Sequence, residues 1–545
     1  MSSKLDDLLT HIGTGAWSYL HTVTLAYSFS LPAYQALAGA FIAPKLEFSC
    51  QHADLRGASL TGGRLGDSAL TNVTGGSQCF YAEHNSSTGT VEERKCTAWD
   101  FDNSTFTSTV TSEFGLVCGR EYLRAMYTSM YMFGIFFGAP ANGFLADKYG
   151  RKPLVVLGGL AYVVVAVLSA WLPNLSAILM ARFVLGVVHP LVTNSGYILA
   201  IEVSEPRLRT ALGITLYLPW ALGAMALGGL AYLLRDWRVL QLAMSVIGLV
   251  MFPALWFMEE SPRWLMVAGN HERSLKVLKK AAKWNKVSLP PQNELLALMK
   301  EELPPSKSDT SARDIKAILK SSLMSGLILF RTPKLRLITT VMYWDYLVLA
   351  MVYYGLSLSG GNLSSDPFVY MVLSGLMEVP AYTLAFPVVY RFGRRGPTVL
   401  CCLLCGLALF VLAAVPADYS WLIVTMALLG KMAITVAFQI AILYSSELFP
   451  TEVRSRGLGT CFMLSRIGSI SSPFITDFLG SLISWAPSVV FGAASLAMGL
   501  ATMALPETLG MALPDTVADL EERGRSDSKR SFLPSFLKKS KQEGN

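Results

Sequence analysis

Four ionisable residues stand inside long apolar stretches of this sequence: Asp345, Glu378, Lys431 and Arg466. A charged side chain costs free energy in hydrocarbon, so such residues mark candidate functional sites by default. A carboxylate in a low-dielectric environment can hold an organic ammonium group, and an arginine can pair a carboxylate through two parallel hydrogen bonds. The four residues therefore predict a site that binds charged organic groups.

Aromatic residues on the same stretches add a second kind of chemistry. A ring face attracts a cation by about 0.5 to 2 kcal/mol and imposes little directional preference, so several rings together would accept varied flat or alkylated cations. The candidates are Tyr217, Trp220, Trp344, Tyr353, Tyr354, Tyr382 and Phe438. The alternative for each ring is ordinary packing or a place in the interfacial aromatic belt. The alternative for Arg466 is a structural ion pair with a protein carboxylate.

Charged residues also recur in short segments between the apolar runs. The spacing of Gly150-Arg151-Lys152 returns at Gly393-Arg394-Arg395, and two further pairs of segments share nearly the same offset. Three matches in one order predict a chain built from two similar halves. The residues concerned are Asp147, Gly150, Arg151, Glu202, Arg209 and Glu260 in the first half, and Arg394, Glu447, Arg454 and Glu507 in the second.

The elements that must position these residues are membrane spans. The chain has 545 residues, of which 52% are hydrophobic and only 15% charged, far from globular averages. Apolar runs of about 20 residues, enough to cross about 30 Å of hydrocarbon, recur about twelve times. We therefore expect an all-α membrane protein of twelve spans in two six-helix halves, with the lipid bilayer as its surroundings. The net charge of +7 does not predict a nucleic-acid partner, because the basic residues lie mainly in loops, linker and tail.

Loop composition sets the expected organisation. The basic linker begins with an amphipathic helix, HERSLKVLKKAAKWNK, and its charge places it inside the cell. That helix is either a solvated surface helix or a regulatory partner site. The expected segments are a cytoplasmic N-terminus (1–16), a first six-span half (17–265) with an extracellular loop (45–120), the cytoplasmic linker (266–336), a second six-span half (337–508) and a cytoplasmic tail (509–545).

Cysteines and glycosylation sequons fall together in the long polar loop. Four clustered cysteines beside three Asn-x-Ser/Thr triplets indicate an oxidising, extracellular environment. Four cysteines allow three pairings, and the sequence leaves the pairing open. The residues are Cys50, Cys79, Cys96 and Cys118, expected to form two disulfides, and Asn72, Asn85 and Asn103, expected to carry glycans.

The combined motifs resemble a known family. The two halves, the loop GFLADKYGRK and the basic linker look like the major facilitator superfamily. The cysteine loop ending in TSTVTSEFGLVC, the stretch ESPRWL, the two Glu-x6-Arg pairs and LPETLG are similar to the organic ion transporters of solute carrier family 22. In that family the loop charges bridge the halves when the inner side is closed, so we expect them to form a gate. The alternative is that they only set topology.

The branch within that family is read from a few positions. VYYGLSLSGGNL and MEVPAYTLAF resemble the organic cation and carnitine branches, and the anion branch carries a Lys where this chain has Tyr382. The narrower cation branch carries an Asp where this chain has Arg466, whereas the carnitine and anion branches carry Arg. Two departures weaken the motifs: Glu259 replaces the Pro usual before ESPRWL, and Tyr390 replaces the Asp of the second loop.

These observations predict a plasma-membrane secondary transporter, with both termini cytoplasmic, that moves small organic cations or carnitine-like zwitterions by alternating access. Asp345 and Glu378 would hold the ammonium end and Arg466 the carboxylate. An organic anion transporter is the alternative, and a receptor, channel or enzyme fits less well, because the sequence has no H-E-x-x-H, G-x-S-x-G or paired-Asp motif. We expect no cofactor or metal, and the coupling ion, Na⁺ or H⁺, stays open.

Overall fold

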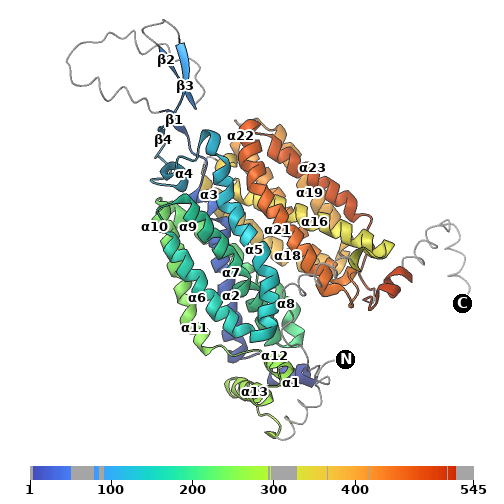
Figure 1. The fold of residues 1–545 in the computed structure, drawn as a ribbon. Helices are drawn as coiled ribbons and strands as arrows, with labels where there is room; N and C mark the ends of the chain where they lie inside the picture. The colour runs from blue at the N-terminus through green and yellow to red at the C-terminus, as the bar shows by residue number, and fades with distance from the viewer. Residues whose placement is uncertain are drawn as a thin grey trace, which may run out of the picture.

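The computed structural model is mostly helical and consists of two helical bundles side by side (Figure 1). It describes residues 4–50, 79–84, 91–292, 295, 328–364, 366–416, 418–511 and 513–522. The expected twelve-span fold is confirmed by its similarity to known transporters, given below. The N-terminal half contains α2 (Ala16–Leu37), α3 (Gly39–Ile42), α5 (Tyr122–Tyr149), α6 (Arg151–Ser169), α7 (Leu175–Glu202), η4 (Pro206–Leu208), α8 (Arg209–Thr215), α9 (Leu218–Leu233), α10 (Trp237–Ile247), η5 (Gly248–Val250) and α11 (Met251–Phe257).

The fifth span expected in the N-terminal half is broken between α8 and α9, where Pro219 lacks the backbone N–H that a continuous helix needs.

The C-terminal half repeats the arrangement of the N-terminal half. The second half contains η6 (Ile328–Phe330), α16 (Pro333–Leu358), α17 (Gly360–Leu363), α18 (Pro367–Phe392), α19 (Arg395–Ala414), α20 (Ser420–Leu448), α21 (Arg454–Phe474), the π-helical turn η7 (Ile475–Leu479), α22 (Gly480–Leu482) and α23 (Ala486–Thr502).

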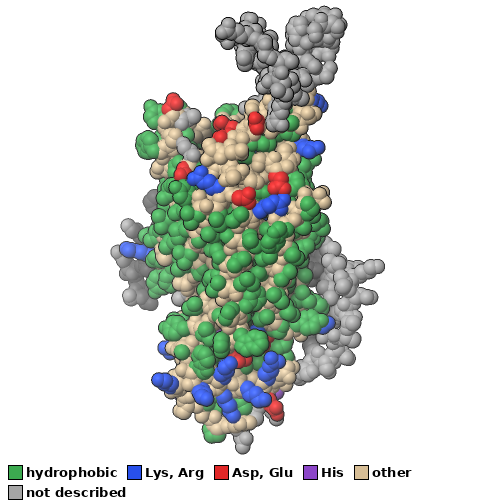
Figure 2. Space-filling view, turned by 90° about the vertical axis from the view of Figure 1, so that its left-hand side faces the viewer, with side chains coloured by type: hydrophobic (Ala, Val, Ile, Leu, Met, Phe, Trp, Pro, Cys, Tyr) green, Lys and Arg blue, Asp and Glu red, His purple; other side chains and the backbone are tan. Residues whose placement is uncertain are grey.

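A broad apolar band crosses the middle of the molecule. On the face that Figure 2 draws, hydrophobic side chains cover this middle part, Lys and Arg cluster most densely at the lower end, and basic and acidic side chains mix near the upper end. Among the described helices, seven are long and apolar enough to cross a membrane. The other predicted spans are shorter, broken or richer in polar residues. The positive-inside rule predicts that the end richer in basic side chains is the cytoplasmic one, and this assignment stays a prediction.

The described part of the cysteine loop contains two small antiparallel sheets. β1 (Phe48–Cys50) pairs with β4 (Trp99–Phe101), and β2 (Phe80–His84) pairs with β3 (Val91–Lys95). Disulfides join Cys50 to Cys96 and Cys79 to Cys118. The loop continues through α4 (Val110–Glu113) and η3 (Cys118–Arg120) into α5. Asn103 is exposed, whereas Asn72 and Asn85 lie outside the described residues.

The opposite end carries a small helical layer made of α1 (Lys4–Ile12), α12 (Pro262–Val267) and α13 (His271–Asn285). As predicted, α13 is amphipathic and buries Leu275, Leu278 and Ala282. The N-terminus is not merely a polar segment, because α1 buries Leu5, Leu9 and Ile12. Those residues follow a helical spacing that the sequence already carries.

Candidate functional site

Glu378 and Lys431 form an ion pair deep inside the C-terminal half. The Lys431 Nζ lies 3.0 Å from Glu378 Oε1, and the two residues are 0% and 1% exposed. Lys431 also donates to the Ser357 hydroxyl and lies 3.1 Å from the ring centroid of Tyr353. The sequence predicted that Glu378 binds the ammonium group of a substrate. In this structure Glu378 instead binds the ammonium group of Lys431.

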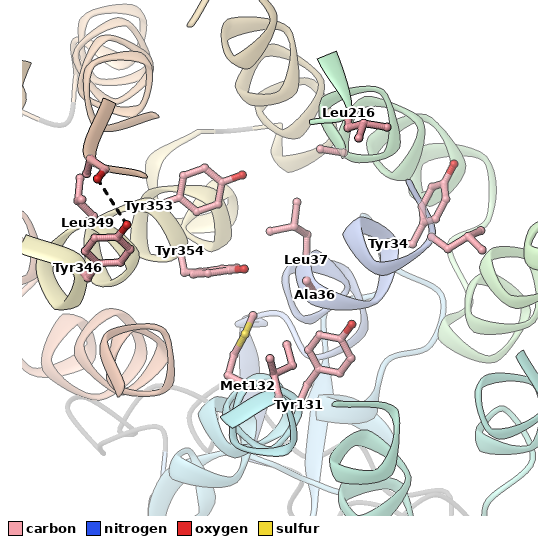
Figure 3. Packing of buried hydrophobic residues seen from close by; sticks show 14 of the residues in the cluster. Tyr34, Ala36, Leu37, Tyr131, Met132, Leu216, Tyr346, Leu349, Tyr353 and Tyr354 are labelled. Carbon is pink, nitrogen blue, oxygen red and sulfur yellow. Dashed lines mark hydrogen bonds between the residues drawn. The ribbon is translucent and has the colours of Figure 1, made fainter. Parts of the chain in front are cut away.

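A hydrogen-bond chain links this pair to the other half. The Trp220 indole on α9 donates to the Tyr353 hydroxyl on α16 over 2.8 Å, and Tyr353 donates to Glu378 Oε1 over 2.6 Å. Tyr382 donates to Glu378 Oε2 over 3.0 Å. Figure 3 shows Tyr353 and Tyr354 extending from α16 toward Leu37 of α2. Trp220, Tyr353 and Tyr382, three of the aromatic residues predicted from sequence, therefore meet where the halves join.

Asp345 lies elsewhere. It is 1% exposed, and its Oδ2 is 3.0 Å from the Thr502 hydroxyl of α23. The titratable groups that interact with it electrostatically are inside the C-terminal half, on α16, α19, α20 and α21. The expected role of Asp345 in holding substrate between the halves does not agree with this placement, because α16 turns that side chain away from the N-terminal half.

Arg466 is the one of the four ionisable residues that is partly exposed. Its guanidinium interacts electrostatically with Tyr354, Tyr217 and His189, groups from both halves. Among the residues that the structure describes, it forms no ion pair. The structural ion pair considered from sequence is therefore not present in this structure.

The remaining predicted rings divide into two groups. Tyr217 lies 6.3 Å from Tyr382 across the halves, measured between ring centroids, and Phe438 lies 6.4 Å from Tyr353. Tyr354 stacks edge-on against Tyr353 at 5.2 Å. Trp344 is 40% exposed and makes no ring contact with this group among the described residues.

The charged residues at the span ends of the N-terminal half pair with one another. Arg151 Nη2 lies 3.4 Å from both Asp147 and Glu202. The Glu260 carboxylate accepts the backbone N–H groups of Arg151 and Lys152, each over 3.1 Å, at the start of α6. Gly150 has φ +98°, and a Cβ there would collide with Glu260. Burial raises the pKa of Glu260, although these N–H donors oppose the shift.

The C-terminal half repeats the arrangement. Glu507 accepts the N–H groups of Arg394 and Arg395 over 2.9 and 3.0 Å at the start of α19, and Arg394 pairs with Glu447 over 2.8 Å. Burial opposes ionisation here too, but the N–H donors outweigh it and lower the pKa of Glu507. Tyr390 is 79% exposed and supplies no counterpart to Asp147.

Arg209 and Arg454 also bind within their own halves. Arg209 pairs with Asp6 of α1 over 2.6 Å, and Arg454 donates to the Phe449 carbonyl over 3.2 Å. Glu259 pairs with Lys280 of α13, so this departure from the family motif attaches the linker helix to the end of the sixth span. The gate residues thus form no bridge between the halves at this end, within the described part of the chain.

The halves close at the opposite end, the one that carries the cysteine loop. Arg124 of α5 pairs with Asp477 of η7 over 3.3 Å, the one ion pair between halves among the described residues. Phe368 stacks on Phe41 at 5.5 Å, and Phe106 lies at the same centroid distance. Sequence reasoning missed this closure: Arg124 and Asp477 are 353 residues apart, and no local pattern links them.

Comparison with known proteins agrees with this architecture. The sequence profile of the sugar (and other) transporter family matches residues 71–517. The chain is 31% identical over 536 residues to the organic cation transporter protein of Drosophila melanogaster, covering 95% of each. It is 33% identical over 434 residues to solute carrier family 22 member 1 of Bos taurus, covering 78% of this chain and 73% of that protein.

The fold is also similar to solved transporters. The xylose transporter XylE from E. coli, in a partially occluded inward-open conformation, matches with a TM-score of 0.60 at 15% identity, over 91% of this chain and 100% of that chain. Among the described residues, no group of His, Cys, Asp and Glu could hold a metal ion. The family match over most of the chain and the two-bundle fold show that this protein belongs to solute carrier family 22 of the major facilitator superfamily and is a multi-pass membrane transporter rather than an enzyme.

Proposed function

We propose that this protein moves small carnitine-like zwitterions, or organic cations, across the plasma membrane by alternating access. The observation that carries the proposal is the charge where the halves join. Glu378 is neutralised by Lys431, and Asp345 is buried away from the N-terminal half. Two cations inside the described bundles have no carboxylate partner, Arg182 and Arg466. Arg182 is enclosed within the N-terminal half, where it donates to Gln35, so Arg466 is the unpaired charge that interacts with both halves. A guanidinium in that position favours a substrate carboxylate.

The aromatic residues support the other end of such a substrate. The rings of Trp220 and Tyr354 offer faces that attract a methylated ammonium group without fixing its direction, whereas the Lys431 ammonium already lies over the Tyr353 ring. The relatives named organic cation transporters support a cationic group in the substrate. Organic anions are the second candidate, because the same uncompensated Arg466 would bind them without any ammonium.

Alternating access is supported by the asymmetry between the two ends. The outer end holds the halves together through Arg124 and Asp477, while the inner charges pair within their halves. An opposite state would require Arg124 and Asp477 to separate and the inner charges to exchange partners. Two states of this kind need differ by only a few kcal/mol for a substrate to shift their populations.

The test is uptake of labelled carnitine, tetraethylammonium and succinate into proteoliposomes, each with and without sodium. Liposomes without protein are the control. We expect saturable carnitine uptake, weaker tetraethylammonium uptake and little succinate uptake. Saturable succinate uptake alone would replace the zwitterion proposal with the anion alternative.

A further inference from the structure

We propose that Asp345 is a proton-binding site inside the C-terminal half, separate from the substrate site, and that it exchanges its proton with the cytoplasmic side during transport. The residue is fully enclosed by its own bundle. Its Oδ1 has no hydrogen-bond partner, and its Oδ2 contacts Thr502. An ionised carboxylate with one unpartnered oxygen lacks the hydrogen bonds that would stabilise its charge, so this environment favours the protonated acid.

Within the described part of the chain, the titratable and polar groups found to interact with Asp345 are neutral in their ordinary forms. The groups come from each element packed around it: Tyr346 on α16, Cys402 on α19, Tyr444 on α20, Cys461 on α21 and Thr502 on α23. Among the described residues, no Lys or Arg pairs with Asp345. A buried charge without a counter-ion is strongly unfavourable, so the surroundings select the neutral, protonated acid.

The hydrogen count at Thr502 agrees with this protonated form. A threonine hydroxyl has one hydrogen, and two acceptor oxygens lie within reach: the Met498 carbonyl at 2.8 Å and Asp345 Oδ2 at 3.0 Å. A carbonyl can only accept. If Thr502 donates to Met498, the contact with Asp345 is a hydrogen bond only when Asp345 carries the proton and donates it. Loss of the proton would turn the Thr502 hydroxyl toward the carboxylate instead.

A polar route leads from Asp345 to the cytoplasmic charges. Tyr444 interacts with Asp345 on one side and with Glu507, Arg395 and Glu447 on the other, and its hydroxyl donates to the Pro506 carbonyl over 2.5 Å. Thr502 ends α23 just before the segment that carries Pro506 and Glu507. In the proposed mechanism, a change in the protonation of Asp345 acts through Thr502 and Tyr444 on the segment whose carboxylate caps α19.

A proton fits this site better than a sodium ion. Sodium is bound by several oxygen ligands. The hydroxyls of the neighbouring Tyr346 and Tyr444 are already bonded to Ser445 and to the Pro506 carbonyl. The other neighbouring side chains supply one oxygen, from Thr502, and sulfur from Cys402 and Cys461. The site is also too closely packed for hydration, because Asp345 is 1% exposed and Cys402, Cys461 and Thr502 are all 0% exposed.

Infrared spectroscopy tests the proton directly and needs no substrate. We compare purified wild-type protein in liposomes with Asp345→Asn, which copies the neutral acid in shape, and with Asp418→Asn, an exposed aspartate on the turn before α20. We expect a protonated-carboxyl band at neutral pH in wild type and in Asp418→Asn, and its loss in Asp345→Asn. A wild-type spectrum without this band at neutral pH would overturn the proposal.

Proton coupling is measured in the same liposomes with carnitine, the substrate of the proposed function. One proton moved per substrate predicts up to a ten-fold change in the carnitine accumulation ratio for each pH unit across the membrane. Asp345→Asn should still exchange labelled for unlabelled carnitine while its accumulation ratio ignores the pH gradient. Carnitine accumulation that follows the pH gradient equally in wild type and Asp345→Asn would refute the coupling role. If neither protein takes up carnitine, the proposed substrate is wrong, and the infrared result alone decides whether Asp345 binds a proton.

Discussion

The buried pair of Glu378 and Lys431 gives a quantitative prediction. Replacing Lys431 by Met leaves the Glu378 carboxylate, 1% exposed, with two tyrosine hydroxyls and no cation. Breaking a buried ion pair by removing one partner costs about 3 to 5 kcal/mol, whereas removing both charges is often nearly neutral. We therefore expect Lys431→Met and Glu378→Gln each to be destabilised by about that amount, and the double variant to recover most of the loss.

The assay is unfolding of the purified protein by titration with a denaturing detergent. Lys276→Met, an exposed lysine on α13, is the matched control and should unfold like wild type. Strong coupling between the two sites should exceed about 1 kcal/mol in the double-variant cycle. Single losses that simply add in the double variant, within about 0.5 kcal/mol, would refute the ion pair.

Three further predictions concern the two ends of the molecule. Glu507→Gln should lower the melting temperature at pH 7. The folded-state pKa of Glu507 lies below the ordinary 4.5, so the difference in melting temperature between wild type and variant should disappear as the pH falls through that lower value. A difference that persists in acid would contradict the capping role. Arg124→Ala removes the ion pair with Asp477, and the loss of about 1 to 3 kcal/mol should shift the population toward an outward-open state by roughly five- to 150-fold. The shift should appear as faster labelling of Phe368→Cys by an impermeant maleimide added outside. Unchanged labelling would reject this closure. Asp147→Ala and Arg454→Ala should reach the membrane normally but transport slowly, since the Asp147 side chain is 81% exposed in this state and its loss costs stability little; normal turnover in both would reject the gate.

The repeated charges were the most informative feature of the sequence. Their common offset predicted two halves, and the structure gives Glu260 and Glu507 the same task of capping the following helix. The two glycines in these motifs recur for a physical reason. Gly150 and Gly393 both adopt positive φ values beside those carboxylates, a conformation that favours glycine. The sequence did not reveal that these charges would pair within each half, since that depends on which end of the transporter is open.

Side-chain direction within a span could not be read in the same way. Trp344 and Asp345 are neighbours in sequence, yet one is 40% exposed and the other 1%. Successive residues on a helix point about 100° apart, so an apolar run surrounded by protein gives little periodic signal to orient it. Partners far apart in the chain, such as Trp220 and Tyr353, were individually nominated as aromatic candidates but their hydrogen bond was not predictable.

Arg466 carries the central claim, and its replacement by Ala gives the most direct test. Removing a charge-assisted partner of the substrate carboxylate costs about 1.5 to 3 kcal/mol, so carnitine uptake per surface transporter should fall roughly ten-fold or more. Tetraethylammonium uptake should fall less or rise, and Arg466→Lys, which keeps the charge but loses the planar fork, should lie between. Equal loss of carnitine and tetraethylammonium uptake in Arg466→Ala would contradict a carboxylate-binding role for Arg466.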